Sequence, residues 1–259
     1  MNARALLIWP LCGLAALTLA PPASGQGRAT LLAVARFHFD AGAPLVAPAG
    51  VALDGSLCVG TVDGYIHALG PDGSYRWSYS VHGAVTRRPL FVGNRWYVAT
   101  SAERLYAFTR EGALAWVFKP PSAVNSELAA DASGRLLFVA ADRFLYGVSA
   151  RGAVTLRTPF SSSLPENQLA FATPPAGTGE PQLEFPSREL RDPEGHEWRG
   201  RSDGVVELRA QAGAVPSLLR LTHSPLFAPI WSAASRYAVL SARSGVVFAL
   251  AAVDVRAGH

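Results

Sequence analysis

The sequence predicts an all-β protein built from about five copies of a four-stranded unit, and three observations lead to this prediction. Short patterns that contain an aromatic residue and a glycine recur about every 40 residues, which is typical of repeat architectures. Each copy contains apolar runs of four or five residues, rich in valine and aromatics and bounded by turn residues, as in short buried strands. No copy contains a pattern that indicates a helix.

The composition is that of a folded globular chain. Of 259 residues, 49% are hydrophobic and only 16% are charged, which excludes an intrinsically disordered protein. The 24 glycines show no three-residue period, which excludes collagen. The length suits one large all-β or α/β domain, or two small ones.

The net charge of +4 does not indicate nucleic acid as a partner. Lys119 is the only lysine among 23 basic residues, and the arginines are scattered along the chain. A nucleic-acid-binding protein usually concentrates its positive charge on one face or helix.

Residues 1–25 have the pattern of a secretory signal peptide. Arg4 precedes an apolar run at 5–20, and small residues follow at 23–25, where a signal peptidase reads the chain. We expect cleavage near Gly25 and a periplasmic or secreted mature protein without a transmembrane segment. An uncleaved anchor is the less favoured alternative, because the apolar run is shorter than the roughly 20 residues of a spanning helix and contains Pro10.

Cys58 is the only cysteine after this cleavage point, so no internal disulfide can form. It lies in an apolar run, where a buried and unreactive thiol is the usual occupant.

The repeat is clearest in the first half of the chain. A strand-like run is followed by a turn glycine and, four residues later, by a large apolar residue. The three clearest copies are 63–77, 102–116 and 142–156. Two weaker copies include 203–213 and 244–250. The spacing between the third and fourth copies exceeds one period by about 20 residues. We place this excess at 188–202, where the run from Asp192 to Gly195 predicts the turn of an inserted hairpin.

An inner strand opens each copy with a similar pair of residues, which gives five copies. These pairs are Pro44-Leu45, Pro89-Leu90, Glu127-Leu128, Gln168-Leu169 and Pro225-Leu226.

The N-terminal segment can supply the strand that the last copy lacks. Residues 35–39 are similar to the outer strand at 75–79 but precede the first copy, and the last copy ends near Leu250 without an outer strand. The N-terminal segment is therefore predicted to pair with the last sheet and to close a β-propeller of about five blades. This predicts a single domain over 26–259 and a monomer. The alternative is an open array that needs a second subunit.

The pattern at 63–77, Asp-Gly-x-x-x-Ala-Leu-x-x-Asp-Gly-x-x-x-Trp, resembles the repeat of the quinoprotein-like (PQQ-repeat) β-propeller family. The resemblance implies that Trp77 and Trp116 dock between neighbouring blades. It also implies that Ala68, Ala107 and Gly147 are small because blades approach closely there.

Two departures from the family's enzymes favour its BamB-like, non-enzymatic branch. The quinone-dependent dehydrogenases of the family are about twice as long, and they carry an adjacent cysteine pair and a calcium site. This chain has no adjacent cysteines. We therefore expect neither a cofactor nor a bound metal.

Polar residues precede the inner strands in four of the five copies and would line the central channel. They are Arg87, Arg88, Asn125, Glu127, Glu166, Asn167 and His223. They could cap strand ends, which is the favoured interpretation, or bind a small anionic ligand through guanidinium groups. A second candidate site is the tip of the predicted hairpin, as a contact surface for a partner. Its residues are Asp192, Glu194, His196 and Trp198.

The sequence favours a non-enzymatic binding or scaffold protein that contacts another envelope or secreted protein, because a rigid array with variable loops offers binding surfaces without catalytic residues. Two alternatives remain. One is a hydrolase-like or lyase-like enzyme that uses Glu127, Glu166 and His223 at the channel face. Glycosidase-like chemistry would require the two carboxylates to lie within about 5 to 10 Å. The other is a degenerate quinoprotein that binds a small anion.

Overall fold

The computed structural model describes residues 30–160, 170–171, 183–184 and 189–255. These residues form strands, turns and loops, with no helix among them that could cross a membrane. The strands assemble into five four-stranded antiparallel sheets, here called blades, and one separate pair of short strands. The predicted all-β architecture of about five four-stranded units is confirmed.

The blades are numbered along the chain. Blade 1 contains β2 (Gly50–Val51), β3 (Leu57–Gly60), β4 (Tyr65–Leu69) and β5 (Tyr75–Ser80). Blade 2 contains β6 (Leu90–Val92), β7 (Arg95–Thr100), β8 (Arg104–Thr109) and β9 (Leu114–Phe118). Blade 3 contains β10 (Ala129–Ala130), β11 (Leu136–Val139), β12 (Phe144–Val148) and β13 (Val154–Pro159). Blade 4 contains β16 (Glu189–Arg191), β17 (Glu197–Gly200), β18 (Val205–Arg209) and β19 (Ser217–Arg220). Blade 5 contains β20 (Ile230–Ser232), β21 (Tyr237–Ser241), β22 (Val246–Val255) and, as its outer strand, β1 (Thr30–Asp40).

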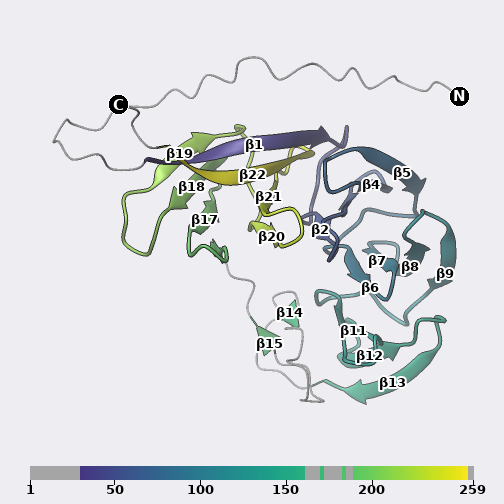
Figure 1. Cartoon of the computed structure of the whole chain (residues 1–259). Coiled ribbons are helices and arrows are strands. Elements are labelled where there is room, and N and C mark those ends of the chain that lie inside the picture. The colour runs from purple at the N-terminus through teal and green to yellow at the C-terminus, as the bar shows by residue number, and fades with distance from the viewer. Residues whose placement is uncertain (1–29, 161–169, 172–182, 185–188, 256–259) are drawn as a thin grey trace, which may run out of the picture.

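The blades follow one another around an arc in the order 4, 5, 1, 2 and 3 (Figure 1). The separate pair is β14 (Ala170–Phe171) with β15 (Leu183–Glu184). The closure of five blades into a complete ring stays a prediction.

The second strand of blades 1, 2, 3 and 5 is buried along almost its whole length. In β3, Leu57 and Val59 pack against blade 5, whereas Cys58 packs against blade 2. The Cys58 side chain is fully buried, and this burial raises the pKa of its thiol far above the ordinary value. The prediction of a buried cysteine is confirmed, and its lack of reactivity stays a prediction.

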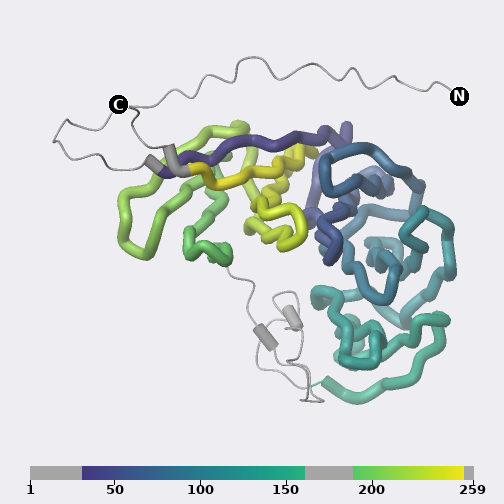
Figure 2. Tube along the Cα trace, viewed as in Figure 1, coloured from purple at the N-terminus to yellow at the C-terminus, as the bar shows by residue number. Residues whose placement is uncertain are grey.

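The first and last strands of the chain pair with each other, as predicted. β1 runs antiparallel to β22 from the pair Thr30 and Val255 to the pair Asp40 and Val246, so the purple and yellow ends of the trace lie side by side (Figure 2). A β-bulge places Arg36 between the paired residues Ala35 and Phe37. The outer strands of blades 1, 2 and 3 carry a register shift at the corresponding place, which explains why 35–39 resembles 75–79.

An aromatic side chain from one outer strand covers the turn glycine of the next blade. A Cβ atom at Gly112 would lie 2.7 Å from the Trp77 indole, and the Nε1–H group of Trp77 donates to the Arg110 carbonyl at 2.8 Å. Trp116 covers Gly152 in the same way and donates to the Ala150 carbonyl at 2.9 Å. Trp77 and Trp116 therefore dock between blades, as the family resemblance implied.

Phe37 of β1 takes the same position on Gly73 of blade 1, since a Cβ atom there would lie 2.5 Å from the ring. The aromatic-on-glycine contact is thus repeated at three consecutive boundaries, from blade 5 to blade 3. A Cβ atom placed on the corresponding turn glycine of blade 4, Gly213, would meet no atom of the described residues within 4 Å. No described aromatic side chain therefore docks on blade 4 in this way.

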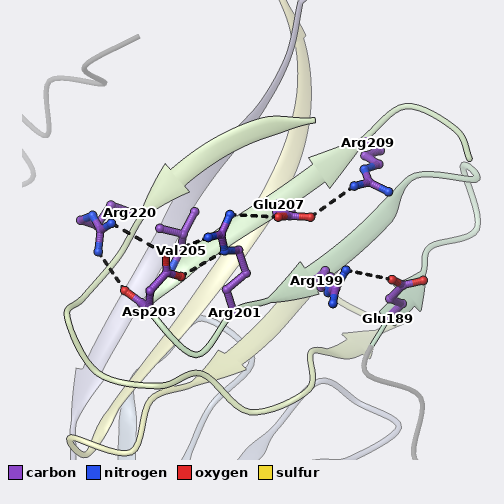
Figure 3. A network of polar contacts seen from close by, with 8 residues as sticks. All are labelled: Glu189, Arg199, Arg201, Asp203, Val205, Glu207, Arg209 and Arg220. Carbon is purple, nitrogen blue, oxygen red and sulfur yellow. Dashed lines mark hydrogen bonds and ion pairs between the residues drawn. The ribbon is translucent and has the colours of Figure 1, made fainter. Parts of the chain in front are cut away.

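The two faces of blade 4 differ in character. One face carries Leu190, Trp198 and Val206, which pack into a core shared with blade 5. The opposite face carries the cross-strand row Glu189, Arg199 and Glu207. Burying this face under a neighbouring apolar sheet would remove several charges from water at a high free-energy cost. The residues of the polar network on this face are Glu189, Arg199, Arg201, Asp203, Val205, Glu207, Arg209 and Arg220 (Figure 3).

The hairpin predicted at 188–202 exists, but it is not an insertion. Its strands, β16 and β17, are the first two strands of blade 4. In the described residues the fourth sheet begins at Glu189, whereas the predicted start, Gln168-Leu169, lies outside the described residues. The turn from Asp192 to His196 has the same hydrogen bonds as the turn from Asp131 to Arg135 in blade 3, so it is an ordinary turn of the repeat.

Alanine substitutions at two turn glycines distinguish the stability contributed by the docking contact from the cost of backbone strain. Gly112 and Gly213 both have positive φ, at 93° and 79°, so alanine at either site should cost about 1 to 2 kcal/mol of backbone strain. At Gly112 the new methyl group also collides with Trp77, which should add about 1 to 3 kcal/mol. Urea unfolding should therefore show Gly112→Ala to be clearly less stable than Gly213→Ala. Equal losses would mean that the Trp77 contact does not hold the blades together.

Candidate functional site

Arg87 joins two blades through its guanidinium group. Its Nε–H donates to the Ser126 carbonyl at 3.1 Å, and Nη2 donates to the Asn125 carbonyl at 3.0 Å, both in the segment that leads into blade 3. Nη1 donates to the Thr86 carbonyl at 2.9 Å. Burial lowers the pKa of Arg87, and the nearby Glu127 carboxylate opposes this shift. All three guanidinium nitrogens are engaged, so these contacts favour a structural role for Arg87 over anion binding.

Glu127 is a partly buried carboxyl at the start of blade 3. Its Oε2 accepts a hydrogen bond from the backbone N–H of Arg88 at 3.3 Å. Burial raises the pKa of Glu127, while Arg88, Arg87 and the hydrogen bond from the Arg88 backbone lower it. The structure thus brings Arg87, Arg88, Asn125 and Glu127 together at the boundary between blades 2 and 3.

Of the other predicted channel residues, the structure describes only His223, which has no hydrogen bond or ion pair with this group. His223 is exposed in the loop between β19 and β20. Glu166 and Asn167 lie outside the described residues, so the convergence of Glu127 and Glu166 stays a prediction.

Asp192 organises the turn between β16 and β17. Its side chain is almost completely buried, and Oδ2 accepts hydrogen bonds from Trp198 Nε1 at 3.0 Å and from His196 Nδ1 at 2.9 Å. Its Oδ1 accepts a third from the His196 backbone at 2.8 Å. Trp198 has no exposed surface, so its side chain cannot contact a partner in this structure. This corrects the predicted contact set: Trp198 and Asp192 hold the turn, and Glu194 and His196 form its outer part.

Glu194 connects blades 4 and 5. Its carboxylate pairs with Arg236 in the turn between β20 and β21, and both side chains are solvent-accessible. The predicted hairpin tip is therefore part of a boundary between blades.

A pocket of about 730 Å³ lies at this boundary, and sequence reasoning did not predict it. It is formed where the turns of blades 1, 4 and 5 meet the ribbon of β1 and β22. No single sequence motif marks it, because these segments come together only in the folded chain. Its lining includes Arg36, Phe37, Asp72, Glu194, His196, Trp231, Arg236, Tyr237, Ala251 and Ala252.

Comparison with known proteins identifies the family. A family model described as outer membrane protein assembly factor BamB matches residues 29–174, more than half of the chain. The chain belongs to this family. The match covers β1 and blades 1 to 3, where the repeat and the aromatic-on-glycine contacts are best formed.

A solved structure of another family member is also similar to this chain. BamB from Moraxella catarrhalis is 14% identical, with a TM-score of 0.48, and the aligned part covers 85% of this chain and 87% of that one. A search of curated proteins found no match.

Removing the Asp192 carboxylate should destabilise blade 4. Asp192→Ala leaves the Trp198 indole and the His196 backbone N–H without an acceptor, which should cost about 2 to 4 kcal/mol of unfolding free energy. Asp203→Ala is the matched control on the same blade. Asp203 is accessible and its ion pairs face water, so its loss should cost no more than about 1 kcal/mol. Urea titrations compare the two, and equal losses would contradict the role assigned to Asp192.

Glu127→Gln should stabilise the protein at neutral pH. Because the pKa of Glu127 is higher in the folded than in the unfolded chain, its contribution to stability is complete below the unfolded pKa of about 4.3 and is lost as the pH rises. The stability gain of the variant should therefore be present at pH 7 and vanish near pH 4. Glu111→Gln, on an exposed turn, serves as the control. A loss of stability in Glu127→Gln at pH 7 would contradict this assignment.

Proposed function

We propose that this protein is an exported β-propeller that binds other proteins of the cell envelope as a rigid, non-enzymatic scaffold. The family match carries this proposal, because the matching model is described as an outer membrane protein assembly factor. The signal-peptide pattern at 1–25, which lies outside the described residues, supports export and cleavage near Gly25.

The architecture supports a scaffold for a physical reason. Blades 5, 1, 2 and 3 are fixed to one another by partly buried aromatic contacts, so the turns at these boundaries keep constant spacing. When a partner binds several of these turns, the scaffold therefore loses little conformational entropy. The pairing of β1 with β22 supports a monomer, since it supplies the outer strand of blade 5 from the same chain.

The group around Arg87 supports the same proposal. Its polar atoms bond to backbone atoms of adjoining blades, so they stabilise the array and leave few free groups for catalysis.

The raised pKa of Glu127 is the one observation that favours a second candidate, a channel-face enzyme or a site for a small anion. In the second case the protein would be a degenerate quinoprotein, and Arg87 or Arg88 would bind its small anionic ligand. The observed hydrogen bonds of Arg87 to backbone carbonyls make this the weaker proposal.

Affinity capture from an envelope extract tests the scaffold. The chain is compared with a variant in which Glu194 and His196 are both alanine, and with Val215→Ala as a control on a strongly exposed loop residue. We expect one protein to be retained in near-stoichiometric amount by the chain and by the control. Its loss from the double variant would locate the contact at the β16–β17 turn. No retained protein above the bare resin would overturn the proposal.

A further inference from the structure

Strand β22 is longer than the strand beside it. β21 pairs with β22 from Ala238 opposite Leu250 to Ser241 opposite Val247. β22 continues to Val255, and over 251–255 the described part of the chain pairs it only with β1. The corresponding strands of blades 1, 2 and 3 are five or six residues long, whereas β22 has ten.

The segment 251–255 therefore has one paired edge and one edge without a strand beside it in the described structure. Successive residues of a strand direct their backbone N–H and C=O groups to alternate edges. About half of the residues in 251–255 thus present both groups toward the open edge. An open edge of this kind is a template for an added strand.

The open edge borders the pocket at the boundary of blades 4 and 5. Ala251 and Ala252 line the pocket together with Tyr237, the residue at which β21 begins. Phe37 and Trp231 provide two further aromatic walls. The volume of about 730 Å³ is within the usual range for binding pockets and large enough for side chains of an extended peptide.

The charged groups that line the pocket are of both signs. The acids that line it have partners: Asp192 bonds to His196 and Trp198, Glu194 pairs with Arg236, and Asp72 bonds to Ser74. Arg36, in contrast, is exposed and has no ion pair or side-chain hydrogen bond in the described structure. The bulge directs this residue away from the regular alternation of β1.

We propose that this edge and pocket bind an extended peptide segment of a partner protein. The segment adds as a strand beside 251–255, places an acidic side chain on Arg36, and places an apolar side chain against Trp231 and Tyr237. Backbone hydrogen bonds provide affinity, and the pocket provides selectivity for alternate side chains. This inference rests on the proposed scaffold function, for which it names the kind of partner.

Selection from a phage-displayed library of random heptapeptides tests the proposal with the whole chain as target. We expect enriched peptides that contain an acidic residue and an apolar one. The most enriched peptide, synthesised with a fluorophore, should bind the chain in a saturable way. Its affinity should fall at least tenfold with Arg36→Glu, and also when alternate amides of the peptide are N-methylated. His38→Glu is the matched control, because His38 is exposed on the same strand and does not line the pocket; it should bind as the unmodified chain does.

Hydrogen exchange tests whether the peptide adds as a strand beside 251–255. On peptide binding, amide exchange over 251–255 should slow at least tenfold. The proposal is overturned if no peptide is enriched, if Arg36→Glu binds the peptide normally, or if exchange over 251–255 is unchanged. It is also overturned if exchange there slows with protein concentration alone, because the occupant would then be a second copy of the chain.

Affinity capture with Arg36→Glu separates this inference from the scaffold proposal. If the chain and Arg36→Glu retain the same envelope protein and no heptapeptide is selected, the scaffold stands and the peptide site is wrong. If neither retains a protein and no peptide is selected, both proposals fail.

Discussion

The contact between an aromatic side chain and a turn glycine is the interaction on which the arrangement of the blades depends. It occurs where Phe37 covers Gly73, where Trp77 covers Gly112 and where Trp116 covers Gly152. The two tryptophans also donate a hydrogen bond to a backbone carbonyl of the next blade. Apolar burial and a directional bond act at the same point, so the contact fixes both the distance and the rotation between neighbouring sheets.

Within the described residues, the aromatic-on-glycine contact is not repeated at blade 4. Blade 4 presents a charged face on the side away from blade 5, and its turn glycine is uncovered. The far face of blade 3 carries Leu137 and Val139, which are buried and apolar. These faces do not complement each other as two ordinary blade faces do. Among the described residues, blade 4 shares a core with blade 5, and none of the described cores joins it to blade 3.

Much of this fold could be predicted from the sequence because each blade repeats the same local requirements. The glycine at a left-handed turn and the large apolar residue four positions later are fixed by backbone geometry and packing, so blades 1 to 3 and the outer strand at 35–39 were predicted. Blade 4 was misread at its start. Its first two strands alternate charged and apolar residues, as in Glu189-Leu190-Arg191, because one face meets water. An alternation of this kind does not match the continuous apolar runs of the other blades.

The candidate site could be predicted only in part, because it depends on contacts between distant segments. The polar residues around Arg87 and Glu127 were found from their repeated position, but their mutual hydrogen bonds were not. The turn at Asp192 was predicted as a turn, although the burial of Trp198 beneath it was not. The pocket depends on where β21 ends and β22 continues, which no local pattern of the chain specifies.

The pairing of β1 with β22 also constrains the order in which the molecule can fold. β1 is among the first strands to be synthesised, but its partner is the last, so blade 5 cannot form until nearly the whole chain is available. Blades 1 to 3 are each made from contiguous residues and can form as they emerge. The cores on both sides of blade 5 contain residues of β1 and β22, so both remain incomplete until that final pairing. We therefore expect the longest loop closure among the described strands to be the last folding step.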